Sequence, residues 1–156
     1  MSEIKTQNLS GKYLTFKLGE ETYGIEILQV QEIIGMMKVT HFPKAPEFVR
    51  GVINLRGKVI PVIDLRLKFF LDGIDDTEKT CIIVIQLETE TEQIREGIIV
   101  DEVSEVIDIL ETEVEQSPSF GVDIDMDFIK GVGKVGERVI ILLDMAKIIS
   151  GTTLEQ

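Results

Sequence analysis

The chain contains one pattern twice, and this internal repeat limits its possible folds more than any other feature. The stretch GVINLRGKVIPVIDLR begins at Gly51, and GVGKVGERVIILLDMA begins 80 residues later, at Gly131. Earlier in each half, GIEILQVQEII at residues 24–34 matches GIIVDEVSEVI at residues 97–107 with an offset of 73. We therefore expect two similarly folded halves, at about residues 12–71 and 80–149.

Short apolar stretches within each half predict β-strands. They are five to eight residues long, rich in Val and Ile, and separated by Gly, Pro and acidic turns. Each half reads as three strands, then a hairpin, then a short helix, and five strands of this length close naturally into a small barrel. The sequence predicts a mostly β single domain of two similar five-stranded barrels packed side by side, barrel one at about 12–71 and barrel two at about 80–149.

Single residues refine this expectation. Asp64 and Asp144 stand immediately before the predicted short helices, where an N-cap belongs. Pro61 has no N–H to donate, so its strand should lie at a sheet edge or a bulge at that point. The second half has Ile141 at the equivalent position, so the two barrels should differ there.

Charge and hydropathy exclude several classes of partner. The chain has 156 residues with a net charge of −12, which repels phosphate backbones and anionic lipid. We expect no nucleic acid partner and no direct membrane insertion. Neither a signal-peptide stretch nor an apolar run of spanning length is found, and one cysteine permits no internal disulfide. The sequence therefore predicts a soluble, cytoplasmic protein.

Two motifs that suggest a cofactor or a metal lack their required context. The glycines of GVGKVG at residues 131–136 have dinucleotide-binding spacing, but a strand follows them where a helix must begin. Asp123, Asp125 and Asp127 have the spacing of a calcium loop, but Phe128 and Lys134 replace its essential Gly and Glu. We expect no cofactor and no metal site.

Catalytic residues are also scarce. The chain has a single histidine, His41, and no G-x-S-x-G motif for a nucleophile. Paired carboxylates remain an alternative, with Glu32 and Glu105 or Asp64 and Asp144 as the pairs. Each pair occupies equivalent places in the two halves, which favours duplicated structure over a convergent active site. We expect no catalytic residues and no enzyme activity.

The two hairpin turns differ in one informative way. The first reads Asn54-Leu55-Arg56-Gly57, and the second reads Lys-Val-Gly-Glu at residues 134–137. Asn and Gly meet the backbone demands of a turn, whereas Leu55 and Arg56 do not. An apolar side chain beside a guanidinium is typical of protein interfaces, although Arg56 could equally pair with a carboxylate of its own chain.

These segments resemble a known family. VQEII at residues 30–34, FVRGVINLRGKVIPVIDLR at residues 48–66 and GIIVDEV at residues 97–103 are similar to the CheW family of chemotaxis coupling proteins. The resemblance covers about residues 12–150. It implies two SH3-like barrels with short helices, forming a scaffold without catalysis. Such scaffolds join the cytoplasmic tip of chemoreceptors to the regulatory domain of the histidine kinase CheA, in arrays at the membrane.

The resemblance also implies site residues. Receptor contact falls on the first hairpin and the start of the VQEII segment, with Arg56, Gly51, Val30, Asn54 and Leu55 as candidates. Kinase contact falls on Glu32, Val30, Ile98 and Val100. We expect Glu32 and Arg56 to form an ion pair between the two segments. The alternatives left open are a β-barrel that binds a small apolar ligand, and a coupler for a related motility kinase.

Overall fold

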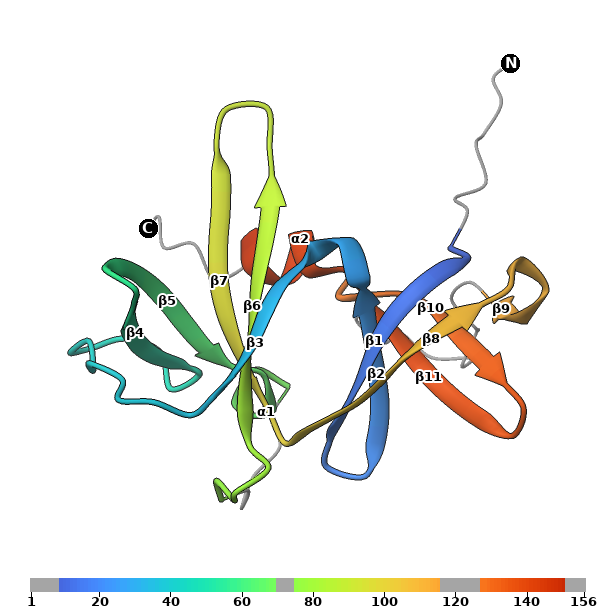
Figure 1. The fold of residues 1–156 in the computed structure, drawn as a ribbon, viewed down its shortest axis with the longest axis horizontal. Coiled ribbons are helices and arrows are strands. Elements are labelled where there is room, and N and C mark those ends of the chain that lie inside the picture. The colour runs from blue at the N-terminus through green and yellow to red at the C-terminus, as the bar shows by residue number, and fades with distance from the viewer. Residues whose placement is uncertain (1–8, 70–74, 116–126, 151–156) are drawn as a thin grey trace.

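A computed structural model describes residues 9–69, 75–115 and 127–150 of the chain. These residues form two β-sheets, accompanied by two short α-helices (Figure 1). One sheet has six strands in the order β8-β1-β2-β11-β10-β9, and the other has five in the order β3-β6-β7-β5-β4. The prediction of a mostly β fold with two similar small sheets side by side is confirmed, although the two-residue strand β9 gives one sheet six strands where we expected five. The six-stranded sheet contains β1 (Gly11–Leu18), β2 (Glu21–Glu26), β8 (Glu102–Ile109), β9 (Val114–Glu115), β10 (Ile129–Val135) and β11 (Arg138–Leu143), and the five-stranded sheet contains β3 (Val30–Gly35), β4 (Val49–Leu55), β5 (Lys58–Asp64), β6 (Cys81–Glu88) and β7 (Gln93–Val100).

The sheets exchange strands between the two halves of the chain. β1 and β2 come from the first half but pair with β8 and β11 of the second, while β6 and β7 pair with β3 and β5 of the first. The expected boundaries of 12–71 and 80–149 therefore need correction, because each sheet combines two strands of one half with the later strands of the other. In each half, the chain crosses to the other sheet between its second and third strands.

The exchange is symmetric in register. β2 runs parallel to β11 with Gly24 opposite Leu142, and β7 runs parallel to β5 with Gly97 opposite Val62. These are equivalent positions at the offsets of 73 and 80. A Cβ atom on Gly97 would lie 2.8 Å from a methyl carbon of Ile82, so the repeated glycine lets the strands approach closely.

The short helices follow the hairpins as predicted. α1 (Leu65–Lys68) begins after Asp64, whose Oδ1 accepts a hydrogen bond from the Arg66 backbone N–H at 3.0 Å. α2 (Met145–Ser150) begins after Asp144, whose Oδ1 accepts from the Lys147 N–H at 3.2 Å. Both aspartates thus cap helices. Within the described residues, no helix is long and apolar enough to cross a bilayer.

Pro61 lies on the inner strand β5, so the edge position that we considered is wrong. The other expected feature, a bulge, lies close by as a register shift of the β4–β5 pairing at Val62 and Ile63. Pro61 faces Val52, whose N–H and C=O bond to Thr40 instead of to β5, at 2.9 and 2.8 Å. On the other side of β5, the pairing with β7 begins only at Val62. Proline is tolerated here because neither neighbouring strand requires its missing N–H.

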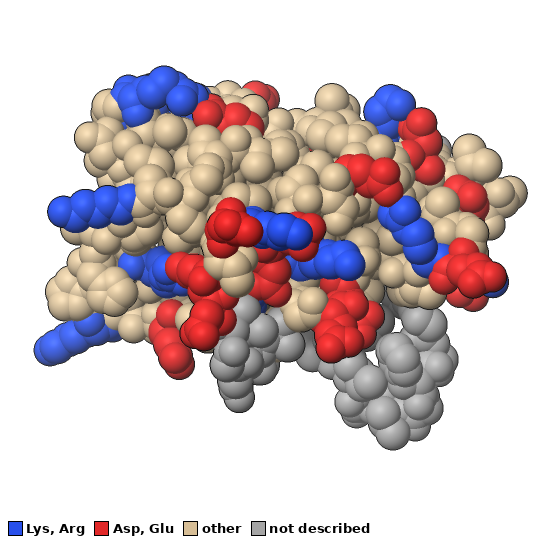
Figure 2. Space-filling model, turned by 60° about the horizontal axis from the view of Figure 1, so that its bottom comes forward, with Lys and Arg blue, Asp and Glu red and all other residues tan. Residues whose placement is uncertain are grey.

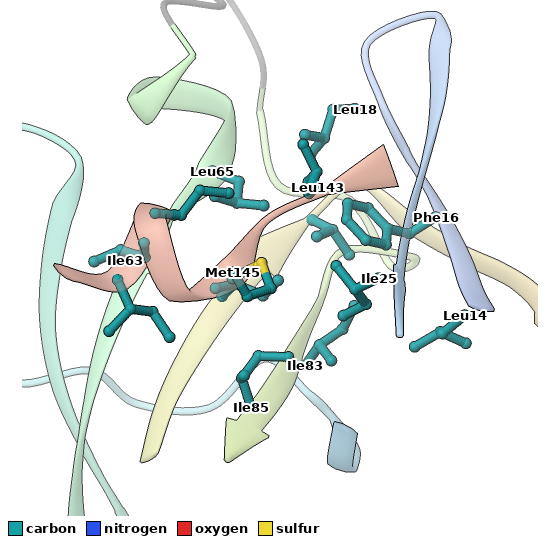
Figure 3. Packing of buried hydrophobic residues seen from close by; sticks show 14 of the residues in the cluster. Leu14, Phe16, Leu18, Ile25, Ile63, Leu65, Ile83, Ile85, Leu143 and Met145 are labelled. Atoms are coloured by element: carbon teal, nitrogen blue, oxygen red, sulfur yellow. The ribbon is translucent and has the colours of Figure 1, made fainter. Parts of the chain in front are cut away.

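The main core joins the two sheets (Figure 3). Phe16 and Ile25 enter it from the six-stranded sheet, and Ile63 and Ile83 enter it from the five-stranded sheet. Met145 of α2 lies in the same cluster. Because this burial removes apolar surface of both sheets from water, it stabilises their side-by-side arrangement.

Candidate functional site

The turn of the first hairpin holds an arginine in an unfavourable backbone conformation. Arg56 and Gly57 connect β4 to β5 with φ values of 52° and 87°, both in the left-handed region, as in type I′ turns. Asn54 supports the turn because its Oδ1 accepts a hydrogen bond from the Gly57 N–H at 2.9 Å. In the second hairpin, Gly136 takes the positive φ of 64°. Among the described residues, Lys44 is the other non-glycine with a positive φ, at 61°. Arg56 is the leading site candidate because its strained conformation coincides with a side chain that is typical of interfaces.

The Arg56 guanidinium contacts Glu32 of β3, and this confirms the predicted ion pair. Its Nη2 donates to Glu32 Oε1 and brings the VQEII segment against the hairpin turn. The Arg56 side chain is still 67% exposed, whereas that of Glu32 is 25% exposed. The pair therefore orients the guanidinium while leaving most of its surface accessible. Asn54 is also exposed, and Leu55 and Val30 are half-buried.

A related ion pair occurs at the second hairpin. Glu105, the equivalent of Glu32 at the offset of 73, accepts a hydrogen bond from Arg138 Nη1 at 2.9 Å. Arg138 stands on the other side of its turn, where the first hairpin has Lys58. Equivalent valines, Val59 and Val139, are exposed beside both turns. The sequences of the two turns do not reveal that both hairpins carry a Glu–Arg pair, because Gly136 is the residue equivalent to Arg56.

Three expected site residues have structural explanations instead. Ile98 and Val100 are 0% exposed and belong to the main core, so they do not form a surface that the kinase could contact. Gly51 is buried at a register shift of β4, with φ 136°. A Cβ atom there would lie 1.9 Å from the Thr40 carbonyl oxygen, so glycine is required by the backbone.

A groove that the sequence did not reveal lies where the two sheets meet. Its most prominent residue is Leu28, which is 93% exposed in the 3₁₀ turn Ile27–Gln29 between β2 and β3. The groove has a volume of about 650 Å³ and is bounded by this turn, the β6–β7 hairpin and α2. Its lining combines the apolar side chains of Leu28, Leu87, Ile94, Ala146 and Ile149 with the polar ones of Gln29, Gln86, Glu88, Thr89 and Lys147. The exposed Leu28 together with the apolar part of this groove makes the junction a candidate binding surface.

The charged side chains form no continuous basic surface on the face that Figure 2 shows. On this face, acidic and basic groups are interspersed. Among the residues that the structure describes, no group of three or more His, Cys, Asp or Glu is placed to hold a metal. Asp123 and Asp125 of the rejected calcium loop lie outside the described residues.

The carboxylates considered for catalysis are engaged in structural contacts. Glu32 and Glu105 pair with arginines, and Asp64 and Asp144 cap helices. The ring nitrogen Nδ1 of His41 lies 3.0 Å from a backbone carbonyl oxygen. The arrangement is suited to binding other proteins through an oriented guanidinium and an apolar groove.

Comparison with known proteins identifies the family of the chain. The profile of a family described as "CheW-like domain" matches residues 12–152. The chain is 39% identical over 150 residues to the "Chemotaxis protein CheW" of Klebsiella aerogenes, covering 96% of this chain and 88% of that protein. It is 38% identical over 144 residues to the protein of the same name from Bacillus subtilis, covering 92% and 87%. The solved structure of the "scaffolding protein TtCheW" from Thermoanaerobacter tengcongensis is similar with a TM-score of 0.76 at 38% identity, covering 87% of this chain and 90% of that one.

Proposed function

The chain belongs to the CheW-like family of chemotaxis scaffold proteins, and from this premise we propose that it couples chemoreceptors to a histidine kinase. The receptor contributes its cytoplasmic tip, and the kinase CheA contributes its regulatory domain. The coupler works in the cytoplasm and reaches the membrane only through its protein partners. It makes or breaks no covalent bond and needs no cofactor or metal.

The observation that carries this proposal is the contact between Arg56 and Glu32. The receptor candidate and the kinase candidate are paired with each other. A partner that competes for Glu32 releases the guanidinium, and a partner that takes the guanidinium releases the carboxylate. Binding at one place therefore changes the free energy of binding at the other, which is the coupling that a signalling adaptor needs.

The groove beside Leu28 is the second element of the proposal. A receptor tip is a bundle of helices, and an apolar helix face fits an apolar groove. β3 begins at Val30, two residues after Leu28, and carries Glu32. The same strand thus links the groove to the ion pair, so a helix docked in the groove lies near the segment that contacts the kinase.

Weak contacts suffice for this role. A transient interface buries about 1,200 Å² or less, so affinities in the micromolar range are expected. Many such contacts in an array strengthen one another through effective concentration. A receptor shift reaches the kinase as a difference of ~1 to 3 kcal/mol in contact free energy.

The alternatives are less well supported. A barrel for a small apolar ligand requires an internal cavity, whereas buried side chains cluster within each sheet, including Ile53 and Ile82 in the five-stranded sheet and Tyr13 and Ile140 in the six-stranded sheet. A coupler for a related motility kinase would use the same surfaces, but the relatives reported above are named for chemotaxis.

Binding measurements with purified partners test the proposal. A receptor cytoplasmic fragment and the kinase regulatory domain are titrated separately with the wild type, Arg56→Asp and Leu28→Glu. We expect Arg56→Asp and Leu28→Glu each to weaken receptor binding. The control is Lys58→Gln, which removes an exposed cation of the same hairpin and should bind normally. Unchanged binding of both partners by Arg56→Asp and Leu28→Glu would refute the assignment.

A charge exchange tests the pairing itself. Arg56→Glu alone places two carboxylates side by side, and Glu32→Arg with Arg56→Glu restores an opposite pair. If the ion pair positions the site, the double variant recovers part of the kinase binding that the single variant loses. Equal loss in both variants would show that the pairing has no such role.

A further inference from the structure

The two places where the chain crosses between the sheets are equivalent in sequence but differ in chemistry. The first crossing is the turn Ile27–Gln29 between β2 and β3, and the second is the single residue Asp101 between β7 and β8. At the offset of 73, Leu28 corresponds to Asp101. One crossing therefore carries an exposed apolar side chain, and the other carries a carboxylate.

Asp101 is held in place by directional bonds to the six-stranded sheet and to α1. Its Oδ1 accepts from Arg66 Nη1 at 3.1 Å, and its Oδ2 accepts from the Gly19 N–H in the β1–β2 turn at 2.7 Å. Its own N–H donates to the Lys17 carbonyl of β1 at 3.1 Å. The second crossing is thus tied at once to the six-stranded sheet and to α1, which follows the five-stranded sheet.

Arg66 makes this crossing part of a larger charged cluster. Its side chain is 2% exposed and donates two hydrogen bonds to Asp64 at 2.9 Å each and one to Asp76 at 2.7 Å. Arg50 donates to the same two carboxylates at 2.7 and 3.2 Å. We call Arg50, Asp64, Arg66, Asp76 and Asp101 the Arg66 cluster. Because buried charges need all their partners, this cluster favours a single arrangement of the segments that it joins.

The equivalent junction beside Leu28 keeps Asp144 in the place of Asp64 but has no counterpart of the Arg66–Asp101 pair. Ala146 stands where the other junction has Arg66, and neither Ala146 nor Leu28 has a side chain that can form a hydrogen bond. Lys130 replaces Arg50 and pairs with Glu26 of β2. The junction is instead bordered by the groove of about 650 Å³, where Leu87, Ile94 and Ile149 lie beside polar side chains. Apolar contacts are non-directional, so they resist sliding of the two sheets less than the Arg66 cluster does.

We propose that the Arg66 cluster is the fixed side of a hinge between the two sheets, and that small rotations about it widen and narrow the groove beside Leu28. The shared core keeps these rotations small. The hinge is a property of the free protein and does not depend on the partners proposed above. If those partners do bind in the groove, the hinge sets how much of the time the groove is open to them.

Distances between spin labels in the free protein test the hinge. Cysteines replace the exposed residues Glu90, between β6 and β7, and Lys134, on β10, in a Cys81→Ser background. Pulsed electron paramagnetic resonance then gives the distribution of distances between the two sheets. We expect Asp101→Asn to broaden this distribution. The control is Asp108→Asn, which makes the same chemical change in an exposed pair with Lys12 within the six-stranded sheet and should leave the width unchanged.

A second variant, which we call the graft, adds a charged pair at the junction beside Leu28 and tests whether this restricts the motion. It keeps the proposal testable even if Asp101→Asn does not fold. Leu28→Asp with Ala146→Arg installs the charged pair at the open junction, where Ala146 is exposed and Asp144 occupies the place of Asp64. We expect the graft to narrow the distribution in otherwise unchanged protein. A wild-type width in the graft, or a folded Asp101→Asn no broader than Asp108→Asn, would overturn the proposal.

Discussion

Replacing Arg56 by asparagine should separate the function of the first hairpin from its stability. An L-residue in the left-handed region costs about 1–2 kcal/mol, and asparagine is one of the few that enters it readily. Asn-Gly is also a preferred type I′ turn sequence. The substitution therefore relieves part of this conformational cost. It also removes the ion pair with Glu32, which at such an exposed position is worth about 0.2–1 kcal/mol.

The two contributions to the free energy of unfolding nearly cancel, and their sum slightly favours the variant. We expect Arg56→Asn to unfold at the same temperature as the wild type or up to about 4 °C higher. Binding should change in the opposite direction, because an interface arginine that carries much of the affinity is worth about 2 kcal/mol or more. Such a loss weakens binding of the receptor fragment by about 30-fold.

Thermal unfolding followed by circular dichroism and calorimetric titration with the receptor fragment measure both quantities on the same samples. Lys58→Gln serves again as the control, because it removes a cation from the same hairpin without changing the turn. A variant that is clearly less stable than the wild type would show that Arg56 serves the fold. A stable variant with normal affinity would show that the strained arginine has no part in receptor binding.

Three further outcomes are expected. Gly51→Ala should be the most destabilising of these changes, because the new Cβ would lie 1.9 Å from the Thr40 carbonyl oxygen, and chemical denaturation measures the loss. Ile98→Val should lower the free energy of unfolding by about 1 kcal/mol while leaving the affinity for the kinase domain unchanged, because the side chain is wholly buried; a selective loss of kinase binding would contradict the core assignment. The hydrogen bond from Arg66 lowers the pKa of Asp76 below its ordinary value of 3.8, so this group adds stability above that pH and loses it as the pH falls through the lowered pKa. Asp76→Asn should therefore be less stable near neutral pH and show a shallower loss of stability in acid, which pH-dependent melting measures.

Local features of the fold were predictable because their causes are local. The N-caps at Asp64 and Asp144 follow from one side chain and the N–H groups that come after it. The hairpins follow from turn residues between apolar stretches. The pair between Glu32 and Arg56 was expected from family motifs, and the structure confirms the contact.

Long-range features were not predictable from the repeat. Gly24 and Gly97 occupy equivalent places whether each half pairs with itself or with the other, so the repeat gives no information on strand exchange. Ile98 and Val100 were assigned to a surface, although the continuous apolar run GIIV is typical of a strand buried on both faces. The last five residues of β7 are indeed all buried. Leu28 gave no signal, because a leucine in an apolar segment is usually buried.

The exchange of strands determines whether one copy of the repeat could fold by itself. A polypeptide with one copy of the repeat would contain two strands of one sheet and the later strands of the other. It could complete neither sheet by itself. Two such polypeptides would own all the parts, so a single-copy ancestor could have assembled this architecture only as an intertwined homodimer. Gene duplication would then have joined the two subunits and freed each copy to change alone, as the contrast between Leu28 and Asp101 shows.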